Sequence, residues 1–282
     1  MKKYLSLVKF SHTIFAMPFA FIGFFLAVQT SEASFDWVKF LLMIACMVFA
    51  RSAAMAFNRY LDREIDARNP RTSTREIPRG AISARSALLF TMLNCLAFMV
   101  VAWFINPLCF YLAPVALLVV LGYSYTKRFT ALCHLVLGLG LSLAPIGAYL
   151  VVTGAFALLP VLFSLAVITW VSGFDIIYAL QDEEFDREEH LHSMPVLLGK
   201  RNALILSVIL HGLSAGFVIA AGLLGEFGWL YGAGTMVYAG MLVYQHSLVK
   251  PNDLSKVNIA FMTANGIASV VFAAFFLADI FL

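Results

Sequence analysis

Long apolar stretches separated by short polar segments are the strongest constraint on how this chain can fold. A helix that crosses the hydrocarbon core of a bilayer needs about 20 apolar residues. Only 12% of the 282 residues are charged, whereas a soluble domain carries about 25%. So little charge cannot cover a water-soluble globule. The sequence therefore predicts an all-α integral membrane protein whose main partner is the lipid bilayer.

The apolar stretches predict about nine transmembrane helices. The expected spans are residues 9–29, 37–61, 84–105, 108–125, 131–152, 157–181, 203–224, 229–249 and 257–281.

The basic residues support this number of spans. With about nine crossings, nearly all lysines and arginines fall on one side of the membrane, and the opposite side keeps only Lys39. By the positive-inside rule the basic side is cytoplasmic. We therefore expect a multi-pass protein of the cell (inner) membrane with its N-terminus in the cytoplasm. A net charge of +3 is too small to indicate a nucleic-acid partner.

Two polar segments on the basic side carry acids at helical spacing, and each continues a predicted membrane span. Residues four apart lie within about 40° of each other on one helix face. Arg51 lies on the same face as the first segment, about 10 Å deeper in the span. The residues on these faces are Asn58, Asp62 and Asp66 in the first segment, and Asp175, Tyr178, Asp182 and Asp186 in the second.

Carboxylates four residues apart repel each other and weaken an isolated helix. A hard cation relieves that repulsion, and Mg²⁺ binds carboxylate oxygens, keeps waters and bridges to substrate phosphates. Basic side chains nearby supply the positive charge that phosphate oxygens require. The pattern predicts two acidic segments that hold Mg²⁺ around a diphosphate, with Arg71, Arg75, Lys127 and Arg128 beside it.

The same residues resemble the signatures of the UbiA family of membrane prenyltransferases. The resemblance covers essentially the whole chain, as one transmembrane domain over residues 1–282 with its acidic motifs at 58–66 and 175–186. The family patterns N-x-x-x-D-x-x-x-D, R-T-x-x-R, Y-x-x-x-K-R and D-x-x-Y-x-x-x-D-x-x-x-D are matched in turn by Asn58-Asp62-Asp66, Arg71-Thr72-Arg75, Tyr123-Lys127-Arg128 and Asp175-Tyr178-Asp182-Asp186.

The resemblance implies a fold of about nine helices around a central cavity and a Mg²⁺-dependent transfer from a polyprenyl diphosphate to an aromatic acceptor. It implies that Asp175 orients the acceptor or takes its proton, that Arg51 binds its carboxylate, and that Tyr178 and Tyr123 stabilise the allylic cation. Within the family, the metal ligands would be Asn58, Asp62, Asp66, Asp182 and Asp186, and the diphosphate-binding residues Arg71, Arg75, Lys127, Arg128 and Tyr123.

The opening Lys9–Pro18 and the turn Arg75–Gly80 look most like 4-hydroxybenzoate polyprenyltransferases of ubiquinone or menaquinone synthesis, including the bacterial futalosine-route subgroup. Many relatives have R-P-L where this chain has Arg75-Glu76-Ile77, which leaves the acceptor open. Dihydroxynaphthoate, homogentisate, haem, chlorophyllide and a lipid headgroup are alternatives within the family. A secondary transporter is a further alternative, because transporters also keep acids in membrane helices.

Overall fold

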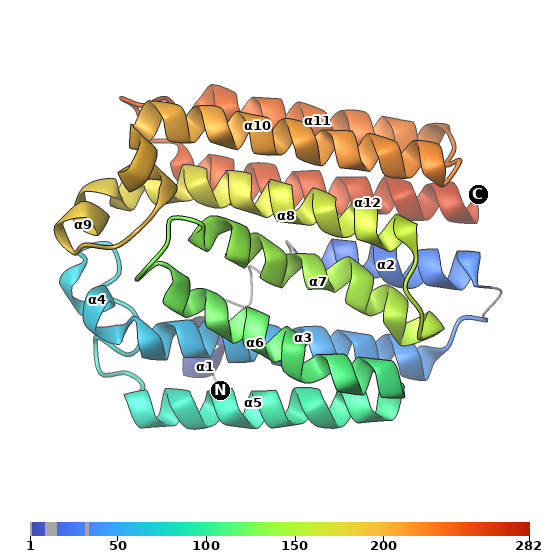
Figure 1. Cartoon of the computed structure of the whole chain (residues 1–282), viewed down its shortest axis with the longest axis horizontal. Helices are drawn as coiled ribbons and strands as arrows, with labels where there is room; N and C mark the ends of the chain where they lie inside the picture. The colour runs from blue at the N-terminus through green and yellow to red at the C-terminus, as the bar shows by residue number, and fades with distance from the viewer. Residues whose placement is uncertain (1, 9–15, 32–33) are drawn as a thin grey trace. The chain divides into compact units, whose positions relative to one another are not determined.

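The computed structural model describes residues 2–8, 16–31 and 34–282. This part of the chain is helical throughout its regular elements (Figure 1). In the same residues the only strand-like pairing is an isolated bridge between Lys250 and Asp253. The predicted all-α fold is confirmed.

The helices are named in chain order in Figure 1. Their bounds are α1 Lys2–Leu7, α2 Met17–Thr30, α3 Trp37–Leu61, α4 Arg63–Arg68, α5 Ala84–Ile105, α6 Pro107–Thr126, α7 Cys133–Thr153, α8 Leu158–Ala179, α9 Glu183–Glu188, α10 Met194–Leu224, α11 Trp229–Leu248 and α12 Asn265–Phe281, with a 3₁₀ turn at Leu180–Asp182 and a π-helix at Ile259–Ala264.

Seven of the described helical segments are long and apolar enough to cross a membrane. The apolar helix α2 has 14 residues, and the expected first span begins in residues 9–15, which lie outside the described part of the chain. Helix α11 is less apolar than the seven because it carries Gln245, His246 and several tyrosines. The chain is thus an integral membrane protein, and about nine spans remains an approximate number.

Local sequence signals fix where the long helices begin and end. Asp36 caps α3, because its Oδ1 accepts a hydrogen bond of 2.7 Å from the Val38 amide. Ser83 and Ser193 cap α5 and α10 in the same way. Gly154 ends α7 with φ of 61°, a left-handed conformation that glycine adopts without a steric penalty. The starts of α3 and α5 and the end of α7 lie close to those expected from the apolar stretches, whereas α10 starts earlier.

The contacts divide the chain into two compact units. The first contains Met1–Thr13 and Asp36–Tyr125, and therefore α1 and α3 to α6. Its small core cluster consists of Leu7, Ala56, Ile82 and Ala87. Helix α5 exposes many large apolar side chains, among them Leu96 and Trp103, as expected for a surface that faces lipid tails.

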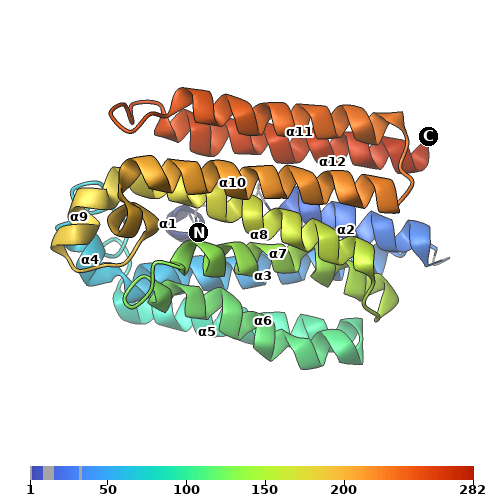
Figure 2. The ribbon, with the colours of Figure 1, turned by 45° about the horizontal axis from the view of Figure 1, so that its top comes forward.

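The second unit contains Ile14–Phe35 and Thr126–Leu282, and therefore α2 and α7 to α12. Its core is aromatic: the Trp170 ring lies 5.4 Å from that of Phe19 and 6.1 Å from that of Tyr238. The buried Trp170 indole donates a 2.8 Å hydrogen bond to Asn265 Oδ1. Helices α11 and α12 lie side by side in this unit (Figure 2).

Helices α7 and α8 approach closely at Gly138. A Cβ at this position would lie 2.5 Å from the Ile168 carbonyl oxygen and 2.6 Å from Ser172 Oγ. Ser172 donates hydrogen bonds to the carbonyl oxygens of Ile168 on its own helix and His134 on α7, the latter 3.1 Å long. Small residues permit such close packing of membrane helices, and hydroxyl groups then bond across the contact.

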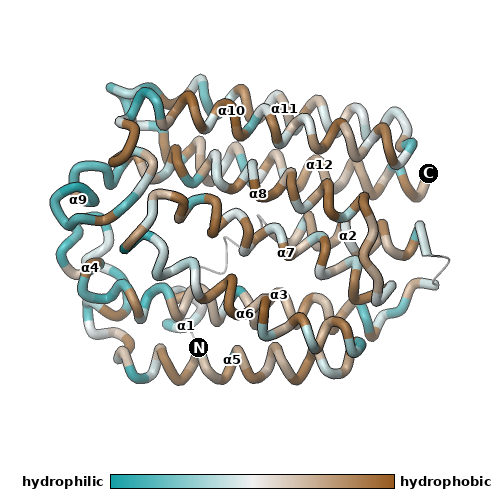
Figure 3. The backbone as a smooth tube through the Cα atoms, viewed as in Figure 1, coloured by the Kyte–Doolittle hydropathy of each residue, from teal (hydrophilic) through white to brown (hydrophobic). Residues whose placement is uncertain are grey.

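Hydrophilic residues gather where the acidic motifs lie in each unit. In Figure 3 the helices are mostly apolar along their length, while α4 in the first unit and α9 in the second are coloured as hydrophilic. Both short helices follow directly on a long apolar helix, α3 and α8 respectively. Each motif therefore follows a membrane helix, as expected, but the helix is not continuous. Asp62 separates α3 from α4, and a 3₁₀ turn separates α8 from α9.

Two further differences concern the cytoplasmic segments expected from the sequence. The short helix α1 precedes the apolar stretch that begins at residue 9, so the pattern of spans does not predict it. Helix α10 starts at Met194 rather than at residue 203, with a break at Gly199, where φ is 75°. The Ser193 cap and the following proline start a helix earlier than the apolar stretch alone suggests.

The close contact at Gly138 gives a stability prediction. Gly138→Ala should destabilise the protein by about 1–3 kcal/mol, because its methyl group meets backbone that cannot move aside. Gly147→Ala on the same helix is the matched control, since nothing lies within 4 Å of its added Cβ. Thermal unfolding in detergent would measure both, and an equal effect of the two substitutions would contradict the close packing.

Candidate active site

The acidic motif of the first unit runs from the end of α3 into α4. The backbone amide of Asp62 donates to the Asn58 carbonyl, and that of Asp66 donates to the Asp62 carbonyl, at 2.9 and 2.7 Å. These bonds keep the four-residue spacing across the break at Asp62. The Asn58 side-chain amide donates a 2.9 Å hydrogen bond to Asp62 Oδ2. Asn58 therefore orients the first acid of the motif.

Asp66 is the buried acid of this motif, with 4% of its surface exposed. Its Oδ1 lies 2.6 Å from a guanidinium nitrogen of Arg75. Its Oδ2 is buried without a hydrogen-bond partner among the described residues. A buried carboxylate oxygen without a partner is costly, and a cation is one way to satisfy it.

Three other groups of the first unit were expected at the site. Arg51 lies inside α3, and its Nε is buried without a hydrogen-bond partner in the described part of the chain. The Tyr123 phenol is close enough to interact electrostatically with Arg51. Arg71 is exposed in the turn after α4, where its amide donates to Asn69 Oδ1. Arg51, whose Nε is buried, is therefore the stronger candidate for binding an anion.

Arg59 is a site residue that the sequence analysis did not assign. It is 5% exposed, and its Nε has no hydrogen-bond partner in the described residues. It interacts electrostatically with Asp66, Arg75 and Tyr123. Its place next to Asn58 on a helix puts it about 100° away from the acidic face, so the spacing of the acids gave no signal for it.

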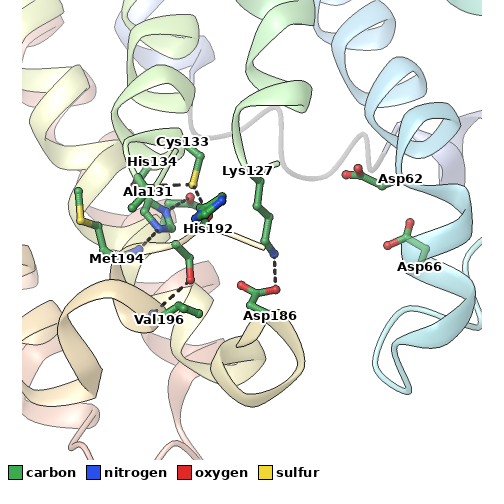
Figure 4. Close-up of polar contacts among 12 residues, drawn as sticks. Asp62, Asp66, Lys127, Ala131, Cys133, His134, Asp186, His192, Met194 and Val196 are labelled. Atoms are coloured by element: carbon green, nitrogen blue, oxygen red, sulfur yellow. Dashed lines mark hydrogen bonds and ion pairs between the residues drawn. The ribbon is translucent and has the colours of Figure 1, made fainter. Parts of the chain in front are cut away.

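The acidic motif of the second unit spans the end of α8, the 3₁₀ turn and α9. Asp182 is 7% exposed and Asp186 is fully buried. Asp186 Oδ1 lies 2.7 Å from Lys127 Nζ (Figure 4). Its Oδ2 has no hydrogen-bond partner among the described residues. In each motif, one buried acid is thus paired with one basic side chain, and the second oxygen of that acid has no hydrogen-bond partner among the described residues.

Lys127 comes from the loop between α6 and α7. Burial of its ammonium disfavours the charge, but the attraction of Asp186 outweighs this, so the pKa of Lys127 lies above its usual value. The lysine therefore stays protonated at neutral pH. Arg128 follows Lys127 in this loop, and both belong to the second unit, whereas Tyr123 lies in α6 of the first.

Asp175 and Tyr178 lie on the last turns of α8, before the buried acids. Asp175 Oδ2 is 2.6 Å from His134 Nδ1 of α7. The Tyr178 ring lies 4.3 Å from that of Phe261, which is on the π-helix. The contact of His134 with Asp175 depends on helix packing that the sequence does not reveal.

The donor set of each motif fits Mg²⁺. No three His, Cys, Asp or Glu side chains of the described residues form a group that could hold a metal by themselves. Mg²⁺ is commonly bound through only one or two carboxylates, with water and substrate phosphate completing its shell. The unpartnered oxygens of Asp66 and Asp186 are suited to that mode of binding.

The ion pair between Lys127 and Asp186 gives a second prediction. Lys127→Gln should lower the free energy of unfolding by about 1–2 kcal/mol, because it leaves a buried carboxylate unpaired, while the 37% exposure of Lys127 weakens the effect. The double variant Lys127→Gln/Asp186→Asn should recover most of the loss. Thermal unfolding in Mg²⁺-free detergent would measure it.

Lys200→Gln is the control, since the Lys200 ammonium lies 3.8 Å from Glu183 Oε2, beyond hydrogen-bond range. Equal losses in the two single variants, or no recovery in the double variant, would contradict the pairing.

Comparisons with known proteins identify the family of the chain. The model of the UbiA prenyltransferase family matches residues 16–276. The 4-hydroxybenzoate octaprenyltransferase of Tolumonas auensis is 32% identical over 205 residues, which are 72% of this chain and 69% of that protein. The corresponding protein of Alkalilimnicola ehrlichii is 30% identical over 198 residues, or 69% and 67% of the two chains.

Solved structures with the same fold are also UbiA proteins. The apo structure of a UbiA homologue from Aeropyrum pernix K1 is 30% identical, with a TM-score of 0.81 over 95% of this chain and 96% of that one. A UbiA homologue from Archaeoglobus fulgidus, bound to GPP and Mg²⁺, is 21% identical, with a TM-score of 0.77 over 99% and 100% of the two chains. The chain therefore belongs to the UbiA prenyltransferase family and is a membrane prenyltransferase, as the motifs predicted.

Proposed function

We propose that this prenyltransferase moves a polyprenyl group from a polyprenyl diphosphate to an aromatic acid, 4-hydroxybenzoate or a close relative, in the biosynthesis of ubiquinone or menaquinone. The observation that carries the proposal is the repeated arrangement of a buried acid, a basic partner and an unpartnered carboxylate oxygen in both motifs. The names of the curated relatives support the choice of donor and acceptor.

The acids would hold Mg²⁺ on the diphosphate. Bound Mg²⁺ supplies positive charge that stabilises the leaving diphosphate. Asp66 and Asp186 each have an oxygen free for this purpose, and Asn58 fixes the orientation of Asp62. The proposed metal ligands are Asn58, Asp62, Asp66, Asp182 and Asp186.

The basic side chains would bind the diphosphate oxygens. Arg75 and Lys127 are now paired with Asp66 and Asp186. A cation at those carboxylates would compete for their negative charge and leave the arginine and lysine available to phosphate. Arg71, Arg128 and Tyr123 complete the proposed diphosphate-binding set.

The acceptor half of the reaction would depend on Arg51, Asp175 and Tyr178. The Nε–H of Arg51 has no partner in the described residues and could donate a hydrogen bond to a carboxylate. A charged group within a membrane span is costly unless it is paired, so Arg51 needs such an anion. The Tyr178 ring face would stabilise positive charge on the allylic carbon. Asp175 would take the proton that the aromatic ring loses. A carboxylate on the acceptor would satisfy the buried Nε of Arg51, and this favours an aromatic acid over acceptors without one.

We further propose that the two units act as a single transferase domain over residues 1–282, with the N-terminus and the acidic motifs on the cytoplasmic side. The distribution of basic residues supports this orientation. Membership of a prenyltransferase family sets the transporter alternative aside. An acceptor other than an aromatic acid remains the second candidate, because the Arg75-Glu76-Ile77 turn departs from the usual family pattern.

The metal site is tested by Asp66→Asn and Asp186→Asn. Each should lower Mg²⁺-dependent release of diphosphate by roughly 100-fold or more, because the leaving group loses its stabilising charge. Membranes with a labelled polyprenyl diphosphate and 4-hydroxybenzoate, with and without Mg²⁺, provide the assay. Asp253→Ala, at an exposed acid of the α11–α12 connection, is the control. Full activity of either Asn variant would refute its assigned role.

The acceptor site is tested by Arg51→Ala. It should raise KM for 4-hydroxybenzoate about 10- to 100-fold, the equivalent of one lost charged hydrogen bond. An acceptor without the carboxylate, 4-methylphenol, should show little change. The exposed Arg85→Ala in the same unit is the matched control. If KM rises equally for both acceptors, Arg51 does not bind the carboxylate.

A further inference from the structure

His134 and Asp175 form a buried pair in the second unit. His134 is the second residue of α7, and its side chain is 3% exposed. Its Nδ1 lies 2.6 Å from Asp175 Oδ2 on α8. The Asp175 side chain is 24% exposed, so it is less enclosed than its partner. The contact with His134 is thus a side-chain hydrogen bond of Asp175 that joins α8 to α7.

The other ring nitrogen fixes the tautomer of His134. The backbone N–H of Met194 donates a 3.2 Å hydrogen bond to His134 Nε2 (Figure 4). Because Nε2 accepts, the single proton of the neutral imidazole lies on Nδ1. His134 is therefore a hydrogen-bond donor to Asp175. Nε2 is thus occupied as the acceptor of the Met194 N–H, which leaves Nδ1–H to donate to Asp175.

The two helices hold this pair in place. The Ser172 hydroxyl donates to the His134 carbonyl oxygen, and Asp175 follows Ser172 by one helical turn. Gly138, one turn after His134, allows the close approach. Each member of the pair is therefore adjacent to a fixed point of contact between α7 and α8.

The segment after the second acidic motif provides the donor to Nε2. The Leu191 amide donates a 2.8 Å bond to the Asp186 carbonyl, and Ser193 then caps the helix that Met194 begins. The backbone that carries Asp186 thus continues directly into the group that sets the tautomer of His134. Both belong to the second unit.

We propose that His134 is a positioning residue for the acceptor half of the transfer, acting through Asp175. The proposal rests on the proposed function. The His134 N–H holds Oδ2 of Asp175 and so turns the carboxylate to present its second oxygen, Oδ1, to the acceptor. His134 itself touches neither substrate, so it is not a catalytic residue.

The proton follows a balanced path. The C1–O bond of the donor breaks and its electron pair leaves with the diphosphate, and a ring carbon of the acceptor then uses its π electrons to form a bond to the allylic C1. The same ring carbon then gives its proton to Asp175 Oδ1, and the C–H electron pair restores the aromatic ring. His134 Nδ1–H continues to donate to Oδ2 throughout this step.

Two isosteric variants separate the two hydrogen bonds of His134. In His134→Asn the amide nitrogen replaces Nδ1 and keeps a donor to Asp175. In His134→Gln the amide oxygen reaches the position of Nε2 and keeps an acceptor for Met194, but the donor to Asp175 is lost. We expect His134→Gln to lower kcat for transfer about 10- to 100-fold and His134→Asn to retain most of it. KM for the prenyl diphosphate should stay nearly constant in both.

The coupling between the two half-reactions gives a readout that a structural role would not affect. The ratio of released diphosphate to prenylated product should be near unity in the wild type. It should rise clearly in His134→Gln, because the acidic motifs still ionise the donor while water captures the cation. Equal losses in the Asn and Gln variants, or an unchanged ratio in His134→Gln, would overturn the proposal.

Met194→Pro is the second variant, for the case that neither His134 variant folds. It removes the N–H that fixes the tautomer at a first helical position, where proline is tolerated, and the extended Ser193 before it is compatible with a following proline. It should also raise the ratio, whereas Met194→Leu, which keeps the N–H, should not. A normal ratio in Met194→Pro would overturn the proposal. If wild-type membranes release no diphosphate with Mg²⁺, it is the proposed function that fails.

Discussion

The absence of water in the hydrocarbon core is the constraint on which the rest of this structure depends. Every backbone polar group in that region needs a partner within the protein, so the spans must be helices. Lipid tails are as apolar as leucine, which means that apolar contact alone does not select one helix neighbour over another. Selection then comes from small residues and from hydroxyl groups that bond across helices. In the second unit, Gly138 and Ser172 provide both at the contact between α7 and α8.

The same constraint determines where charge is tolerated. Buried acids such as Asp66 and Asp186 lie just past the ends of long apolar helices and each has a basic partner. A buried charge without a partner would strongly destabilise the folded protein, so each acid is found with a basic side chain beside it. The pairs are incomplete, however, because each acid keeps one oxygen without a hydrogen bond among the described residues. This combination of a satisfied and an unsatisfied oxygen suits a site that must bind and release a cation with its substrate.

The chemistry proposed for the acceptor depends on the packing that holds the helices together. His134 and Asp175 meet because α7 and α8 approach closely one turn away, at Gly138 and Ser172. Met194 reaches His134 because the segment after Asp186 folds back before α10 begins. Helix packing, the second acidic motif and the candidate base are therefore mechanically connected within one unit.

The sequence by itself determined the membrane class, the approximate spans and the identity of the two acidic motifs. It could do so because the length of an apolar stretch and a four-residue spacing are local properties of a helix. Tertiary structure alone decided which groups the motif residues contact. Two of these contacts join residues far apart in the chain: Asp66 and Arg75 are 9 positions apart, and His134 and Asp175 are 41 apart. The burial of Arg59 depends on which face of its helix is covered. No periodicity encodes these contacts, because the close approach of two helices depends on side-chain shape on both of them.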